Sequence, residues 1–302
     1  MALAVVLGFA IAFVVRSWDD VAAGMGRLST GSLLASFVFA VGGLGASAAA
    51  WRATLAALGS RLSLPAAARV YYLGQLGKYI PGSVWPIVAQ AELSREYDVP
   101  RSRAALSALV QMLLSVVVGG VVAAAALAAA DLVPAVPYGV LLGVAVAGAV
   151  LLVPAVFSRL LALAARVLRR GAPEPIASRP LAAAVGWVGV MWLMFGLHLW
   201  ALARAHAVDD LRLVVGCVGV FALAWVAGFL VVLVPAGAGA REAALVLSIA
   251  PLVAHGDALS IALVSRVLML VGDFALAGAG VAAEKRRRPA PAVAVNDGTA
   301  AP

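Results

Sequence analysis

The chain has 302 residues, of which 64% are hydrophobic and 12% are charged, and its mean hydropathy is +1.06. A soluble domain of this length cannot bury so much apolar surface, so the composition predicts a protein that lies in a lipid bilayer. The charge balance is basic, with 22 Lys and Arg residues against 14 Asp and Glu residues. These basic residues stand between apolar segments, as in membrane proteins, and no basic face with interleaved aromatic residues indicates nucleic-acid binding.

Apolar segments recur along the chain at the length that a helix needs to cross a bilayer core, which is about 20 residues. The predicted spans are residues 2–15, 32–50, 104–130, 138–157, 181–203, 213–234 and 258–282. No basic segment precedes the first of them, so we interpret it as a retained, slightly short span rather than a signal peptide. The sequence therefore predicts an all-α, polytopic helical bundle of about seven or eight transmembrane helices.

Two further apolar stretches, residues 64–93 and 235–255, are interrupted by proline, glycine and charge. The residues expected to break or hinge the helices are Pro81, Gly82, Pro235, Gly237 and Gly239. Broken backbone at membrane depth is tolerated only where it is buried in protein or lines a wet cavity. Matching breaks in two halves of a chain indicate an internal repeat around a substrate site, and chance in a sequence rich in Ala, Gly and Val is the alternative.

Basic residues set the predicted orientation. Residues 158–180 hold five Arg residues and the segment 285–288 holds four basic residues, so both are expected in the cytoplasm, whereas the loop 131–137 has none and is expected outside. Residues 64–93 then leave and return on one face as a re-entrant hairpin, and residues 240–254 must cross, as a short or discontinuous helix. These assignments divide the chain into a transmembrane domain, residues 1–283, and a basic, disordered cytoplasmic tail, residues 284–302.

Ionisable side chains at bilayer depth cost about 2.5 to 3.5 kcal/mol each on insertion scales, so each needs a reason to be there. The interrupted stretches and the last span contain six of them: Lys78, Glu92, Arg241, Glu242, Arg266 and Asp273. Arg241 and Glu242 follow a glycine-rich turn at a predicted helix start, where backbone amides and a guanidinium suit a phosphate. The alternative is that both side chains pair with neighbouring helices.

The other candidates also carry two interpretations. Gln75 and Lys78 share a helix face beside Tyr79, which suits a binding site, but Lys78 also suits a helix C-terminus and the tyrosine an interfacial belt. Arg266 and Asp273 are two turns apart on one face, so we expect them to brace or gate an interior cavity, with a structural ion pair as the alternative.

The sequence lacks the motifs of the common catalytic and metal sites. Cys217 is the only cysteine, so a disulfide within the chain and a thiolate cluster are excluded. The segment 74–78 lacks the spacing of a phosphate-binding P-loop, no paired histidines mark a metal site, and no nucleophile lies in a triad context. We therefore expect no enzymatic activity, no catalytic residue, no metal and no cofactor.

Two segments resemble a known family. Gly74-Gln-Leu-Gly-Lys-Tyr-Ile-Pro-Gly-Ser-Val-Trp85, followed by Glu92, and Pro235-Ala-Gly-Ala-Gly-Ala-Arg-Glu-Ala-Ala-Leu245 resemble the transmembrane region of lysylphosphatidylglycerol synthases, a family with many free-standing, flippase-like bacterial and archaeal proteins. In the two-part synthases this region is associated with moving the aminoacylated lipid between leaflets, and a separate soluble domain makes that lipid. The resemblance implies the membrane module without the synthase domain.

These observations together predict a lipid translocase of the cell membrane that binds an anionic phospholipid or polyprenyl-phosphate headgroup. The residues expected to contact the headgroup are Lys78, Arg241, Glu242, Gln75, Tyr79 and Glu92. The alternative is a non-catalytic membrane partner or regulator of a separate envelope lipid synthase or glycosyltransferase. An intramembrane enzyme acting on lipid is a third reading, disfavoured because the carboxylates lack a nucleophile or metal partner.

Overall fold

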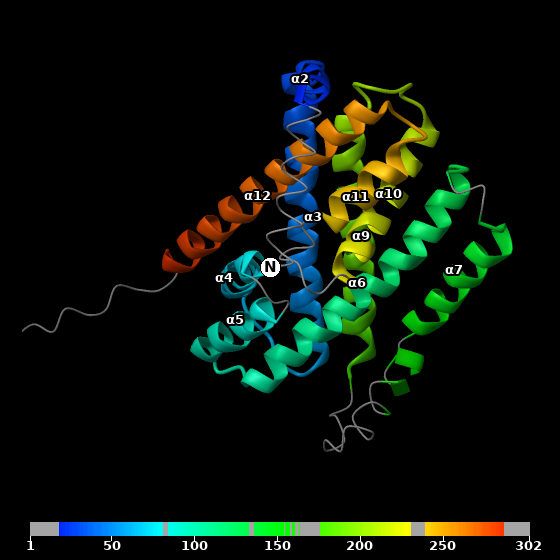
Figure 1. Cartoon of the computed structure of the whole chain (residues 1–302). Coiled ribbons are helices and arrows are strands. Elements are labelled where there is room, and N and C mark those ends of the chain that lie inside the picture. The colour runs from blue at the N-terminus through cyan, green and yellow to red at the C-terminus, as the bar shows by residue number, and fades with distance from the viewer. Residues whose placement is uncertain are drawn as a thin grey trace, which may run out of the picture.

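The computed structural model describes residues 18–80, 84–132, 136–153, 155–157, 159–160, 163, 176–230 and 239–286, and every element in these ranges is a helix (Figure 1). Five helices are long and apolar enough to cross a membrane: α3 (Thr30–Ala57), α6 (Arg101–Ala129), α9 (Ser178–Ala203), α10 (Leu211–Leu230) and α12 (His255–Lys285). The shorter elements are α2 (Trp18–Gly26), α4 (Leu64–Gln75), η1 (Leu76–Tyr79), α5 (Trp85–Ser94), η2 (Arg95–Tyr97), α7 (Tyr138–Leu152) and α11 (Ala240–Ile249). The prediction of an all-α polytopic bundle is confirmed.

The long helices coincide with predicted spans, and one predicted span is shorter than expected. α7 ends at Leu152 instead of residue 157, so it has 15 residues and a length of about 22 Å. The helix ends there because the next residue, Val153, precedes a proline and is extended, with ψ 121°. The predicted span 2–15 lies outside the described residues, as does the tail from residue 287 onward.

Contacts between helix termini define two ends of the bundle. At one end, Arg27 after α2 donates two hydrogen bonds to Asp257 in the first turn of α12, at 2.8 and 3.0 Å, and His206 after α9 lies 3.0 Å from the same carboxylate. At the other end, the Ala177 amide before α9 donates to the Ala57 carbonyl at the end of α3, at 3.0 Å. We call these the Asp257 end and the Ala57 end.

α4, η1 and α5 form the re-entrant hairpin that the sequence predicts. The hairpin starts and finishes at the Ala57 end, where Arg103 at the start of α6 donates to Ser60 before α4 at 3.1 Å. Its arms approach closely, because a Cβ on Gly74 would lie 2.5 Å from Gln90 Cγ and one on Gly77 would lie 2.9 Å from the α5 backbone. The glycines therefore permit the contact between the arms.

α10 and α11 form a second hairpin, which enters from the Asp257 end. α10 starts there, where Arg212 donates to the Ala130 carbonyl after α6 at 2.9 Å. α11 packs back along α10, and a Cβ on Gly228 would lie only 2.8 Å from Arg241 Cβ. Because α11 has ten residues and a length of about 15 Å, the crossing predicted for residues 240–254 is a half-length helix that returns to the Asp257 end.

Each half of the chain packs extensively against helices of the other half. α3 lies along α9 and runs in the opposite direction (Figure 1). The first hairpin packs through α4 on α12, the second packs through α10 on α6, and α2 flanks α12 as α7 flanks α6. Each half thus has a flanking helix, a long helix, a hairpin and a second long helix, in opposite orientations. This is the arrangement of an inverted repeat, in agreement with the repeat inferred from the matching breaks.

Candidate headgroup cavity

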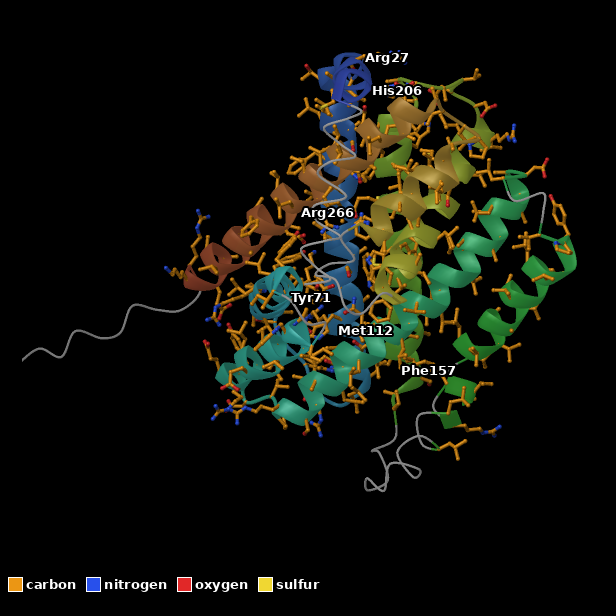
Figure 2. The ribbon with its side chains drawn as sticks, in the orientation of Figure 1. Arg27, Tyr71, Met112, Phe157, His206 and Arg266 are labelled. Atoms are coloured by element: carbon orange, nitrogen blue, oxygen red, sulfur yellow. The ribbon has the colours of Figure 1, made fainter. Side chains whose placement is uncertain are left out.

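A cavity of about 230 Å³ lies between the two hairpins. Residues from both halves line it, among them Tyr71 of α4, Met112 of α6 and Arg266 of α12, which Figure 2 labels. Pockets for drug-sized ligands are about 300 to 1,000 Å³, so this cavity suits a small polar group and not a whole lipid.

The structure brings most of the predicted site residues together in the cavity wall. The lining includes six of them: Gln75, Lys78, Tyr79, Arg241, Arg266 and Asp273. Two of the predicted residues, Glu92 and Glu242, lie outside the lining. Pro81, Gly82, Pro235 and Gly237 lie outside the described residues.

Lys78 and Asp273 form an ion pair between the halves. Lys78 Nζ at the end of the first hairpin arm lies 2.6 Å from Asp273 Oδ2 of α12, and the Tyr79 hydroxyl donates to the same oxygen at 2.5 Å. The Asp273 side chain is only 3% exposed. Two donors therefore hold this buried carboxylate, as a charge at membrane depth requires.

Glu242 stabilises the start of α11. It accepts a hydrogen bond from the Gly239 amide at 2.7 Å and another from Arg266 at 3.0 Å. Gly239 has φ 86°, a left-handed conformation that glycine adopts without a steric penalty, so this predicted helix break is present. For Glu242, the structure shows the pairing role that the sequence left open beside headgroup contact.

Arg241 lies in the cavity wall and has no anionic partner among the described residues. Its guanidinium is 4.9 Å from the centroid of the Phe221 ring, and no described residue forms an ion pair or hydrogen bond with it. The charged groups at the site are three cations and two carboxylates: Lys78, Arg241, Arg266, Asp273 and Glu242. Three minus two leaves a formal excess of one positive charge, and an anion in the cavity would balance it.

A second wall of the cavity is neutral and polar. Ser47 of α3 and Tyr71 of α4 share a hydrogen bond of 2.6 Å between their hydroxyls. Gln111 of α6 donates from Nε2 to the Ser47 hydroxyl at 3.1 Å, the Ser47 carbonyl at 3.3 Å and the Tyr71 hydroxyl at 3.3 Å. Gln90 of α5 also lines the cavity and is 1% exposed.

The sequence analysis missed this neutral wall because it selected charged residues and, among neutral ones, only Gln75 and Tyr79 in the segment of Lys78. One signal was present in the sequence, since Ser107, Gln111 and Ser115 recur at intervals of four residues within the apolar segment of α6. Residues at that spacing share one helix face, and all three are buried. A polar stripe within an apolar span indicates an inward-facing surface.

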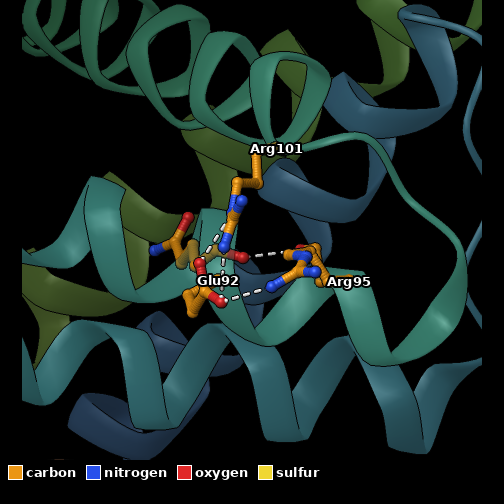
Figure 3. Close-up of polar contacts among 5 residues, drawn as sticks. Glu92, Arg95 and Arg101 are labelled. Carbon is orange, nitrogen blue, oxygen red and sulfur yellow. Dashed lines mark hydrogen bonds and ion pairs between the residues drawn. The ribbon is translucent and has the colours of Figure 1, made fainter.

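Glu92 lies on the exposed surface at the Ala57 end, away from the cavity. Arg101 donates to it at 2.7 and 2.9 Å and Arg95 at 2.9 Å (Figure 3), and these hydrogen bonds lower the pKa of Glu92 to about 2. Residues two positions apart on a helix point about 200° apart, so Glu92 faces outward where Gln90 faces inward. The sequence indicates the charge but not which face of α5 is buried.

These features define a polytopic helical membrane protein with a small, cationic cavity between two inverted hairpins. The family described as the lysylphosphatidylglycerol synthase TM region matches residues 1–277, and the chain belongs to that family. No curated protein matches the chain. The resemblance stated from the two interrupted segments is confirmed.

Proposed function

We propose that this protein is a lipid translocase whose cavity accepts the anionic headgroup of a phospholipid or polyprenyl phosphate while the acyl chains stay in the bilayer. The observation that carries the proposal is Arg241, a cation that lines the cavity with no carboxylate partner among the described residues. Lys78 and Arg266 add positive charge, and their carboxylate partners already balance them. In this proposal the protein catalyses no covalent reaction.

The arrangement of the hairpins supports movement of the lipid as well as binding. Inverted repeats with discontinuous helices at the membrane midplane are common in secondary transporters, where they allow a central site to open alternately to each side. Here the two hairpins enter from opposite ends of the bundle. The Lys78–Asp273 pair connects the first hairpin to α12 of the other half across the cavity. We assign that pair a gating role and the Arg266–Glu242 pair a bracing role.

Leaflet exchange in proteoliposomes tests the proposal. The vesicles contain phosphatidylcholine and a trace of phosphatidylglycerol with a fluorescent acyl chain, and dithionite quenches the label in the outer leaflet. We expect the protein to accelerate exchange of the labelled lipid and Arg241→Gln to slow it about tenfold or more, because a charge-assisted hydrogen bond contributes about 1.5 to 3 kcal/mol. Arg61→Gln is the matched control, since Arg61 is exposed at the Ala57 end and does not line the cavity.

The alternative role, as a membrane partner of a lipid synthase or glycosyltransferase, gives a different result. The purified protein would then move no anionic lipid, and it would be recovered from membranes together with an enzyme. Exchange at the wild-type rate in Arg241→Gln would contradict the assignment of the cavity as the headgroup site.

A further inference from the structure

The neutral wall of the cavity contains hydrogen-bond acceptors to which no residue in the described part of the chain donates. A backbone carbonyl can only accept, so the bond to the Ser47 carbonyl fixes which amide atom of Gln111 is Nε2. The other two acceptors of Nε2, the hydroxyls of Ser47 and Tyr71, lie on the same side. Oε1 is therefore directed away from this network, and no described residue donates to it.

Gln90 supplies a second acceptor of this kind. Its side chain lines the cavity and is 1% exposed, and its Oε1 has no hydrogen-bond partner among the described residues. Gly74 on the facing helix makes room for it, because a Cβ there would clash with Gln90 Cγ at 2.5 Å. A buried acceptor without a donor costs free energy that a bound donor restores. On this wall, the carboxamide oxygens of Gln90 and Gln111 thus both lack a donor among the described residues.

The charges of the cavity decide which donors fit. Among the described residues that line it, Asp273 is the one carboxylate, and Lys78 and Tyr79 occupy it. Glu242 is held by Arg266 and the start of α11. An ammonium group would find no free carboxylate and would face the positive excess at Arg241, whereas hydroxyl groups can donate to carboxamide oxygens without a counter-charge.

We infer that the substrate is a phosphodiester lipid of net charge −1 whose terminal group is uncharged and carries hydroxyls, such as glycerol or a sugar. The phosphate lies against Arg241 and the hydroxyls donate to Gln90 and Gln111. The inference rests on the proposed function and narrows it, because headgroups with an ammonium, including ethanolamine and aminoacyl esters, are poor substrates. The lysylated lipid in the family's description is therefore not the best substrate of this chain.

A pair of lipids that differ only in hydroxyl groups tests the inference. Phosphatidylpropanol has the charge and headgroup length of phosphatidylglycerol but lacks the two free hydroxyls of its glycerol headgroup. With acyl-labelled versions of each, we expect wild-type protein to exchange phosphatidylglycerol about tenfold faster, which is the effect of about one hydrogen bond. Labelled phosphatidylinositol separates the two sources of hydroxyls: exchange as fast as phosphatidylglycerol supports a sugar-like headgroup, and exchange of phosphatidylglycerol alone supports glycerol.

Gln90→Leu is the matched variant, because the carboxamide of Gln90 makes no hydrogen bond with a described residue that the substitution would break. We expect Gln90→Leu to lower the ratio of phosphatidylglycerol exchange to phosphatidylpropanol exchange toward one, and Arg241→Gln to slow both lipids while leaving that ratio high. Equal wild-type exchange of the two lipids, or exchange of lysyl-phosphatidylglycerol as fast as phosphatidylglycerol, overturns the inference and leaves the proposed function standing. Exchange of none of these lipids overturns both.

Discussion

Lys78 and Asp273 connect the two halves of the protein by an ion pair of 2.6 Å inside the cavity. Breaking a buried pair by removing one partner is costly, because the other charge stays buried without compensation. We expect Lys78→Met to destabilise the folded protein by about 3 to 5 kcal/mol, the usual cost of such a change. Thermal unfolding in detergent micelles measures this as a lower Tm.

The double variant Lys78→Met/Asp273→Asn is the control for that prediction. It removes both charges, and because an asparagine can still accept from Tyr79, most of the lost stability should return. If the double variant is as unstable as Lys78→Met alone, the packing of the lysine stem and not its charge stabilises this contact.

Glu92 differs from the cavity residues because it is solvent-exposed and paired with Arg101 and Arg95. Its pKa in the folded protein, about 2, lies below the ordinary value of 4.5, so the ionised form stabilises the fold above about pH 4.5 and this contribution is lost as the pH falls toward 2. We expect Glu92→Gln to leave lipid exchange unchanged and to lower Tm slightly at pH 7. The Tm difference from wild type should shrink between pH 4.5 and 2, and slower exchange at pH 7 would contradict the placement of Glu92 outside the site.

Among the residues that line the cavity, the sequence predicts four charged ones, Lys78, Arg241, Arg266 and Asp273, and the neutral Gln75 and Tyr79 in the same segment as Lys78, but not the neutral wall. Two further predicted carboxylates, Glu92 and Glu242, lie outside the lining. Lys78, Arg241 and Asp273 could be selected because a charge within an apolar segment is costly and rare. Gln90 and Gln111 could not, because a neutral amide perturbs hydropathy little and its importance depends on partners from other helices. Whether a predicted charge enters the cavity also depends on helix rotation, which short helices such as α5 leave undetermined.

At the scale of the elements, α9 approaches the backbone of α10 closely at a glycine. A Cβ on Gly196 would lie 2.5 Å from the Val218 Cα, a backbone atom that cannot move aside, whereas one on Gly189 of the same helix would meet nothing within 4 Å. We expect Gly196→Ala to destabilise the protein by about 1 to 3 kcal/mol through overpacking. Gly189→Ala is the matched control and should be neutral or stabilising by up to about 1 kcal/mol, since alanine favours helix. Equal Tm values for the two variants would show that α9 and α10 are not in this contact.

The extent of the elements could be predicted where hydropathy alone decides it. The spans at α3, α6, α9, α10 and α12 follow from runs of apolar residues, and both interrupted stretches are hairpin arms. α7 is shorter than predicted because the helix is interrupted at Val153, before Pro154, although hydropathy and helical backbone continue at residues 155–157. The close packing of α11 on α10 at Gly228 could not be predicted, because this contact joins segments that no local pattern relates.

For the whole molecule, the exchange of partners between halves could not be predicted from the sequence. The matching breaks indicate a repeat, but the packing of α3 on α9 and of each hairpin on the other half's last helix depends on contacts distant in sequence. The exchange has a physical consequence. Each hairpin packs on helices of the other half, and residues of both halves line the cavity. The cavity therefore forms only when both halves fold together.

Charge is distributed unequally between the two ends of the bundle. The Ala57 end has six arginines, Arg52, Arg61, Arg69, Arg95, Arg101 and Arg103, against three acidic residues, Glu92, Glu96 and Asp98. The Asp257 end has three arginines, Arg27, Arg204 and Arg212, against four aspartates, Asp131, Asp209, Asp210 and Asp257. By the positive-inside rule we propose that the Ala57 end, and with it the tail 284–302, faces the cytoplasm of a cell whose plasma membrane holds the protein.

Cysteine labelling in intact cells tests that orientation against a low background, because the native Cys217 is fully buried. Single cysteines are placed at Val208, which is 81% exposed at the Asp257 end, and at Arg61 at the Ala57 end. A membrane-impermeant maleimide should label Val208→Cys in intact cells and Arg61→Cys only after permeabilisation, with the unsubstituted protein as the control. The reverse pattern would place the Ala57 end outside. The first hairpin would then open to the exterior, and a headgroup taken from the cytoplasmic leaflet would enter through α10 and α11.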